Sequence, residues 1–220
     1  MGGIGDDSRT ARIASTRAFF APRAVGWEDR FPDDGPRYAR AVADLESPAG
    51  GTVLDAACGT GRALPALRAA VGPAGTVVGV DLTTEMLAEA ARRGRNSVAA
   101  LVLADAMTLP FATGSLDAVF AAGLLPHLAD PVSGLIELAR VCRLGGRLAL
   151  FHPIGRATLA RRHGDEPDPE DILSEGRVRT ALEGTGWSCD LVEDAEDRYL
   201  VLAVRVNGGV PARQAGSEGA

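Results

Sequence analysis

Three aspartates, Asp55, Asp81 and Asp105, each follow a short apolar run that we expect to form a strand. Because the carboxyl ends of parallel strands meet at the same edge of a sheet, the three carboxylates should converge on one crevice. Asp81 stands about 20 residues after Gly61, a spacing that suits acceptance of hydrogen bonds from two ribose hydroxyls. The Asp105 carboxylate could accept a hydrogen bond from an exocyclic amine such as adenine N6. The alternative for such acids is capping of the following helix.

A tight loop of small residues follows the first of these aspartates. The run is Val53-Leu54-Asp55-Ala56-Ala57-Cys58-Gly59-Thr60-Gly61. Glycines let the backbone approach a ligand, and the amino end of the next helix offers free N–H groups. A dinucleotide-binding G-x-G-x-x-G loop would need a third glycine at position 64, where this chain has Leu64. The pattern therefore favours a nucleotide-like ligand other than a dinucleotide.

Two histidines follow later strands on the same edge of the expected sheet. His127 comes after the fourth predicted strand and His152 after the fifth. Imidazole titrates nearest to neutral pH, so either side chain could act as a base. A structural role is the alternative for His127, whereas base and structural roles are equally compatible with His152. His163 lies in a polar stretch and is expected to be solvated.

The composition excludes several classes of chemistry. The chain has 220 residues and no lysine, so a Walker-type phosphate loop, a pyridoxal-phosphate Schiff base and a lysine base are excluded. A net charge of −6 argues against capture of nucleic acid or of an anionic membrane surface. Three dispersed cysteines favour neither a metal site nor a disulfide framework. Without a signal peptide or a membrane-length apolar run, we expect a cytoplasmic protein that has no membrane partner.

Strands and helices alternate along the middle of the chain. We expect an α/β, doubly wound, Rossmann-like sheet of seven strands, mostly parallel, with an antiparallel C-terminal hairpin. The predicted strands are 52–56, 76–80, 98–103, 116–121, 147–151, 187–192 and 198–206. The predicted helices between them are 62–71, 83–93, 131–143 (stopped by Gly145-Gly146) and about 177–185, with two more before residue 46.

The central 100 residues also resemble a known family. Residues 52–151 are similar to class I S-adenosylmethionine-dependent methyltransferases of the type 11 group, related to the ubiquinone/menaquinone methyltransferases. One departure is Ala57, which stands where that family has its first loop glycine. We expect the alanine to be tolerated if its backbone is not left-handed. Besides the loop, the resemblance rests on Val78–Leu87, Ala104–Phe111, Ser115–Val119 and Arg140–Leu148.

The resemblance implies a role for each site residue. The loop residues Asp55, Ala56, Ala57, Cys58, Gly59 and Gly61 would hold the methionine part of the cofactor. Asp81 would bind ribose, Leu82 and Met86 would lie against adenine, and Asp105 and Ala106 would recognise its edge. Ala122 and Gly123 would line the pocket after the fourth strand. For His127 the resemblance favours a structural or cofactor-facing role over that of a base.

The resemblance also suggests a division of the chain. Residues 1–10 and 207–220 are expected to be disordered, and 11–206 to form one methyltransferase domain. Within it, 11–46 would be a helical cap, 52–151 the cofactor-binding core, and 152–206 an acceptor-side segment, mostly loop to 176, ending in the hairpin. Trp27, Phe31 and Tyr38 would form an aromatic lid over the acceptor, or simply pack the cap onto the core.

The activity that follows is transfer of a methyl group to an oxygen, nitrogen or carbon of a small-molecule acceptor, releasing S-adenosylhomocysteine. No metal is implied, and a homodimer is possible. The alternative is a protein of the same fold that binds S-adenosylmethionine without transferring methyl, as a cyclase or a sensor.

Overall fold

A single seven-stranded sheet forms the centre of the molecule. The computed structural model describes residues 4–207, with side chains described from Asp7 onward. The strand order is β3-β2-β1-β4-β5-β7-β6, and the sheet has the predicted seven strands. The first five strands are parallel, and β7 runs antiparallel to both β5 and β6. The strands are β1 (Thr52–Ala56), β2 (Thr76–Asp81), β3 (Ala100–Leu103), β4 (Leu116–Ala122), β5 (Cys142–His152), β6 (Trp187–Ala195) and β7 (Arg198–Arg205).

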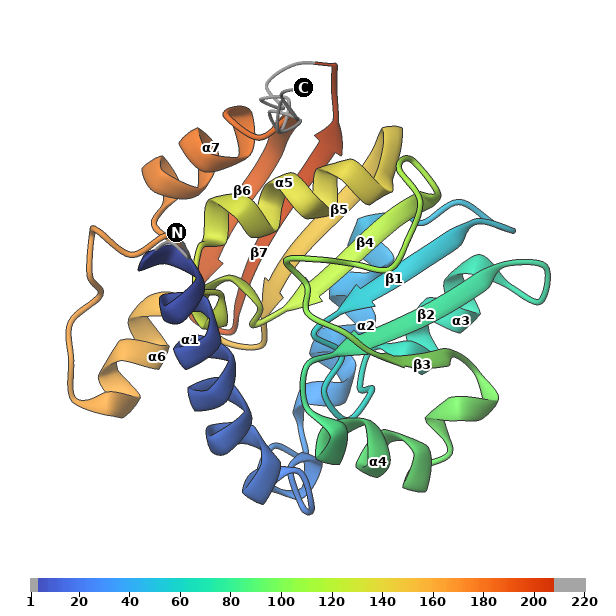
Figure 1. Cartoon of the computed structure of the whole chain (residues 1–220), viewed down its shortest axis with the longest axis horizontal. Helices are drawn as coiled ribbons and strands as arrows, with labels where there is room; N and C mark the ends of the chain where they lie inside the picture. The colour runs from blue at the N-terminus through green and yellow to red at the C-terminus, as the bar shows by residue number, and fades with distance from the viewer. Residues whose placement is uncertain (1–3, 208–220) are drawn as a thin grey trace, which may run out of the picture.

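Helices cover both faces of the sheet (Figure 1). One face carries α5 (Pro131–Val141) and α7 (Glu175–Glu183), and the opposite face carries α2 (Asp34–Leu45) and α3 (Leu64–Val71). A fifth helix, α4 (Thr84–Arg92), packs against β2 and β3. The strand residues Val53 and Leu54 are both fully buried because successive side chains point to opposite, helix-covered faces. None of the described helices is long and apolar enough to cross a membrane.

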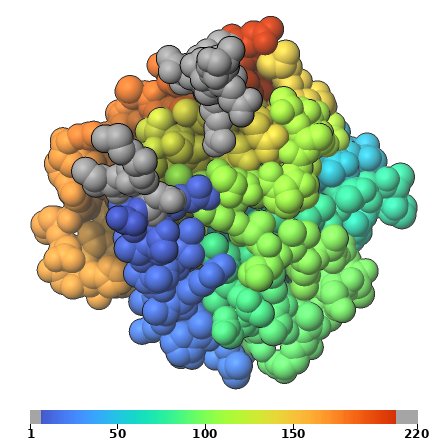
Figure 2. Space-filling model, in the orientation of Figure 1, coloured from blue at the N-terminus to red at the C-terminus, as the bar shows by residue number. Residues whose placement is uncertain are grey.

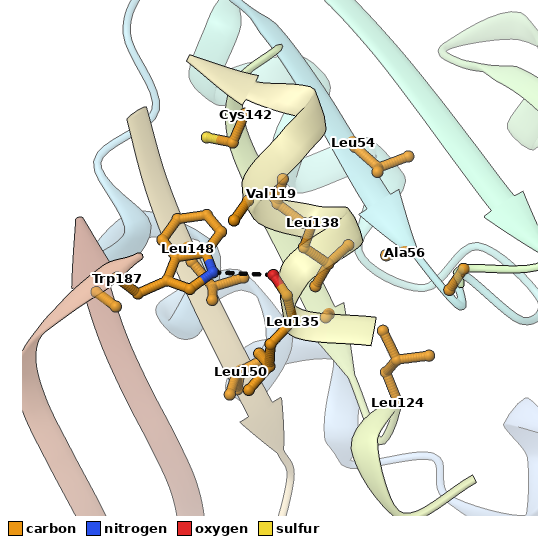
Figure 3. Packing of buried hydrophobic residues seen from close by; sticks show 14 of the residues in the cluster. Leu54, Ala56, Val119, Leu124, Leu135, Leu138, Cys142, Leu148, Leu150 and Trp187 are labelled. Atoms are coloured by element: carbon orange, nitrogen blue, oxygen red, sulfur yellow. Dashed lines mark hydrogen bonds between the residues drawn. The ribbon is translucent and has the colours of Figure 1, made fainter. Parts of the chain in front are cut away.

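Trp187 anchors the face covered by α5. Its side chain is 1% exposed and packs with Leu135, Leu138 and Leu148 (Figure 3). The indole N–H donates to the Leu135 carbonyl (3.1 Å), so this buried donor is satisfied. The contact fixes the start of the C-terminal hairpin against the helix that follows β4.

The amino-terminal segment differs from its prediction. Residues 1–10 were expected to be disordered, but α1 extends over Ile4–Phe20, so that prediction is wrong from Ile4 onward. Glycine and aspartate dominate the first seven positions, yet Arg, Ala and Ile fill the following turns and favour a helix. Short 3₁₀ turns, η1 (Ala21–Arg23) and η2 (Glu28–Arg30), join α1 to α2.

One prediction needs refinement and another needs correction. The stretch 152–176 is mostly loop, as expected, but it contains α6 (Arg156–His163), which has no buried residue and hence no apolar stripe to reveal it. Gly145 and Gly146 do not stop the helix, since α5 ends at Val141 and the glycines lie inside β5. The register against β4 shifts there, and a Cβ at Gly146 would lie 2.5 Å from the Cys142 sulfur, so the pair allows a β-bulge. Of the tail predicted to be disordered, residues 208–220 lie outside the described residues.

Candidate cofactor site

The glycine loop between β1 and α3 is folded tightly against β2. The Cys58 N–H donates to the Val80 carbonyl (2.9 Å), and the Gly61 N–H donates to the Cys58 carbonyl (2.8 Å). Gly79 leaves space for this loop, because a Cβ there would lie 2.9 Å from the Cys58 sulfur. Gly59 and Gly61 have φ values of 54° and 79°, which glycine adopts at little cost.

Ala57 also lies in the left-handed region, with φ of 63°. The condition under which this alanine was expected to be tolerated, a backbone outside the left-handed region, is therefore not met. Its Cβ makes the conformation unfavourable, and the surrounding loop hydrogen bonds hold it in place. The loop keeps the geometry that a glycine would give and stores strain at one residue.

Asp55 and Asp81 meet beside this loop at the carboxyl ends of β1 and β2. The Asp81 carboxylate accepts from the N–H groups of Gly59 and Thr83, both at 2.8 Å. Asp55 is 1% exposed, and its Oδ1 has no hydrogen-bond partner within the described structure. Burial, reinforced by the nearby Asp81 charge, raises the pKa of Asp55 to about 8. Burial also raises the pKa of Asp81, although the two N–H donors oppose this shift.

Asp105, after β3, is occupied by an arginine from α1. Nε and Nη2 of Arg9 donate to its Oδ2 at 3.1 and 2.7 Å, and Nη2 also donates to Thr108 (2.9 Å). A cavity of about 20 Å³ lies beside Asp105 and is lined by α1, Leu82, Asp105, Met107 and residues 127–129. An open hollow of about 570 Å³ adjoins it along Ser8, Ala11, Arg12 and Ser15 but does not reach Asp105.

The other residues assigned by resemblance lie at the same edge or just beneath it. Leu82 is half-buried and lines the small cavity, whereas Met86 and Ala106 are buried. Ala122 ends β4, and the Gly123 N–H donates to the Phe151 carbonyl (2.9 Å). This bond joins the ends of β4 and β5.

Both candidate histidines stand at this joined edge. His152 ends β5, and its Nδ1 lies 2.8 Å from the Ile154 carbonyl oxygen, closer than the 3.3 Å to the Ile154 nitrogen. A carbonyl only accepts, so Nδ1 carries the proton and Nε2 keeps a lone pair. Burial lowers the pKa of His152 and of His127, and the Arg12 charge lowers that of His127 further. Both imidazoles are therefore neutral at pH 7.

The three aromatic residues predicted as a lid do not form one group. Trp27 and Phe31 contact each other, with centroids 5.5 Å apart, and Trp27 reaches His127 through Phe20. Tyr38 instead packs on Phe151 with centroids 4.9 Å apart, within the core between α2 and the sheet. Its hydroxyl pKa is raised by burial, so it stays neutral.

Sequence reasoning missed the contribution of α1 and of Glu28. Glu28 accepts from the Thr60 hydroxyl (2.9 Å), and its Oε2 lies 3.4 Å from Arg95. Arg62 donates to the carbonyls of Phe31 and Glu28. These contacts fasten residues 28–31 to the glycine loop. No sequence motif marks them, because they join residues more than 30 positions apart.

The fold and the site together define a nucleotide-binding α/β protein of the doubly wound class. The unpartnered, buried Asp55 oxygen and the carboxylates of Asp81 and Asp105 fit a ligand that has several hydrogen-bond donors, such as an adenosine bearing an amino-acid tail.

Known proteins are similar to this chain. A family model described as a methyltransferase domain matches residues 54–150. A demethylmenaquinone methyltransferase of Roseiflexus sp. is 30% identical over 68% of this chain and 73% of its own length. The O-methyltransferase cnsE of Penicillium expansum is 31% identical over 78% of this chain and 66% of its own. The crystal structure of an S-adenosylmethionine-dependent methyltransferase from Aquifex aeolicus superposes with a TM-score of 0.64 at 25% identity, covering 77% of this chain and 89% of that one.

The chain belongs to the class I S-adenosylmethionine-dependent methyltransferases, in the type 11 group. The family prediction is thus confirmed. The chain spans about two fifths of the length of two other relatives, which are 43% and 38% identical to it.

Proposed function

We propose that this protein transfers a methyl group from S-adenosylmethionine to a hydroxyl oxygen of a small molecule. The observation that carries the cofactor assignment is the group of three acids at adjacent strand ends around the glycine loop. Asp55 is its most informative member, because a buried carboxyl oxygen without a partner is costly unless a ligand supplies a donor.

Different residues of the site would hold different parts of the cofactor. Asp55 and the loop from Ala57 to Gly61 would hold the amino-acid tail, with the cofactor ammonium as donor to Asp55. Asp81 keeps free lone pairs beside its two backbone contacts and would accept from ribose hydroxyls. Asp105 would accept from the adenine amine.

S-adenosylmethionine supplies an electrophilic methyl group on a sulfonium, with S-adenosylhomocysteine as the product. This chain must then bring the acceptor into line and exclude water. His152 would take the hydroxyl proton on Nε2, since its Nδ1–H is directed to the Ile154 carbonyl, which fixes the tautomer. Phe20, Trp27 and Phe31 would cover the acceptor beside His127.

An oxygen acceptor is supported by the neutral histidine, because a hydroxyl needs its proton removed as it attacks. A relative named as an O-methyltransferase supports the same choice. No nucleic-acid or membrane partner is part of the proposal, in keeping with the acidic composition.

The test is calorimetric titration of the purified protein with S-adenosylmethionine and S-adenosylhomocysteine. We expect micromolar binding that Asp81→Asn weakens at least 30-fold, because about 2 kcal/mol or more is lost with charged hydrogen bonds. The matched control is Asp190→Asn, an exposed acid on β6 with the same change of charge. Absence of binding in the wild-type protein would overturn the proposal.

An acceptor screen by mass spectrometry separates transfer from the alternative. A product heavier by one methylene unit together with released S-adenosylhomocysteine supports methyl transfer. A rearranged product of unchanged mass would show that the bound cofactor serves another reaction.

A further inference from the structure

One face of α1 lies across the adenine end of the candidate site. Arg9, Arg12, Ile13, Thr16 and Phe20 recur at helical spacing and form this face. Figure 1 places α1 at the edge where the parallel strands end, and Figure 2 shows its residues, in blue, on the surface against the green middle part of the chain.

The arginines of this helix hold backbone and carboxylate oxygens of the site itself. Arg9 binds Asp105, as described above, and the side chain of Asp105 is only 14% exposed in this pair. Arg12 donates to the carbonyls of Pro126 and His127, and Arg17 donates to the Leu82 carbonyl at 3.0 Å. We call Arg9, Arg12 and Arg17 the arginine latch.

The latch leaves too little space for a purine. The cavity between α1, Leu82 and Asp105 measures about 20 Å³, which is room for about one water molecule. Sites that hold molecules of cofactor size measure roughly 300–1,000 Å³. A ligand can therefore reach Asp105 only when α1 moves.

We propose that α1 is a gate that the arginine latch holds shut, with the Arg9 guanidinium competing with the adenine amine for Asp105. This inference rests on the proposed function, because it requires that adenine binds at Asp105. Cofactor binding then depends on the fraction of molecules in which the latch is open. The measured dissociation constant equals the constant of the open form divided by that fraction.

The fold confines the motion to α1. None of the α1 residues from Asp7 to Phe20 is buried, so opening exposes little apolar surface. Besides the arginine contacts, the Phe20 ring packs on Trp27 and His127. The next segment is anchored, since Ala24 is 1% exposed and Glu28 binds the glycine loop. The hinge therefore falls in residues 21–23, between the end of α1 and Ala24.

The experiment measures the binding of S-adenosylhomocysteine to the full chain by stopped-flow tryptophan fluorescence and by calorimetry. Trp27 is the reporter, because its ring packs on Phe20 at the end of α1. The variant is Arg9→Gln, which keeps a polar side chain but loses the ion pair. The matched control is Arg179→Gln on α7, which removes the same charge together with an exposed ion pair to Glu175.

Arg9→Gln should raise the association rate and lower the dissociation constant by the same factor, roughly five- to tenfold for a partly exposed ion pair with charged hydrogen bonds. The dissociation rate should stay unchanged, as should every constant of Arg179→Gln. Raising NaCl from 50 to 500 mM should speed association of the wild-type protein more than that of Arg9→Gln, since salt weakens the latch.

Two results would overturn the gate while leaving the proposed function intact. One is wild-type binding with an unchanged association rate in Arg9→Gln. The other is a faster dissociation rate in Arg9→Gln, which would make Arg9 a contact of the bound ligand. If neither protein binds S-adenosylhomocysteine, both the proposed function and the gate fail.

Discussion

Asp55 makes the stability of this protein depend on pH, and Asp55→Asn should remove that dependence. The pKa of Asp55 is raised to about 8 from 3.8, so the folded state binds this proton more tightly than the unfolded chain does. The extra stability that protonated Asp55 gives the folded state is fully present below pH 3.8, the pKa of the unfolded chain, and is lost as the pH rises towards 8. At about 1.4 kcal/mol for each pKa unit, the free energy of unfolding falls by about 4 kcal/mol between pH 5 and 8.

The charged groups around Asp55 set the sign of this effect. Asp81 on β2 is the nearby negative charge, while Cys58 in the loop and Tyr38 on α2 have raised pKa values and stay neutral through pH 8. Arg62 is the cation that faces Tyr38 from the loop. No hydrogen bond among the described residues compensates Asp55 Oδ1, so its ionisation is opposed by burial and by Asp81 together.

The assay is urea unfolding at pH 5, 6, 7 and 8, followed by the fluorescence of the buried Trp187. Asp55→Asn should be the more stable protein at pH 8, by several kcal/mol, and the two should converge towards pH 5. Asp190→Asn is the control and should follow the wild-type protein within about 0.5 kcal/mol. Parallel loss of stability in wild type and Asp55→Asn across this range would refute the reasoning.

Two further predictions concern the loop and the base. Ala57→Gly should raise the free energy of unfolding by about 1 kcal/mol, measured by thermal denaturation, because glycine relieves the left-handed strain at φ of 63°; an unchanged or lower melting temperature would contradict this. His152→Gln should lower kcat roughly 100-fold with an acceptor found in the mass screen, yet leave S-adenosylhomocysteine affinity within twofold. Because the pKa of His152 is lowered, wild-type activity should persist until the pH falls below 6.5. A midpoint above pH 7 in the pH–activity profile would argue against His152 as the base.

The sheet and the acids were predictable because their signals are local. Apolar runs that end in Asp55 and Asp81 specify buried parallel strands, and a parallel sheet brings such ends together by geometry alone. The same reasoning predicted the C-terminal hairpin from two apolar runs and the charged turn at residues 193–197. Most strand ends needed no more than two residues of correction, but β5 begins at Cys142 instead of 147 and β6 continues to Ala195 instead of 192.

The covering of the site was not predictable in this way. Arg9 and Asp105 are 96 positions apart, and Arg12 meets carbonyl groups, which every residue carries. The sequence predicted a helix in this segment, but neither its start at Ile4 nor the residues that its polar side chains contact. Tyr38 is not part of a lid because it packs onto the core, which was the alternative considered for it. Its neighbours Ala41, Val42 and Leu45 turn that face of α2 into the core.

Two unfavourable features of this fold lie within three residues of one another at the end of β1. Asp55 carries an unpaired buried oxygen, and Ala57 holds a left-handed backbone, while the apolar clusters on both sides of the sheet contain nothing comparable among their described members. Strain and unmet polar groups persist where the surrounding structure enforces them and where a ligand relieves them. A ligand that donates to Asp55 would recover part of the cost of burying it. Asp105 differs, because its Oδ1 already accepts from the Met107 N–H and Arg9 of the arginine latch satisfies its Oδ2.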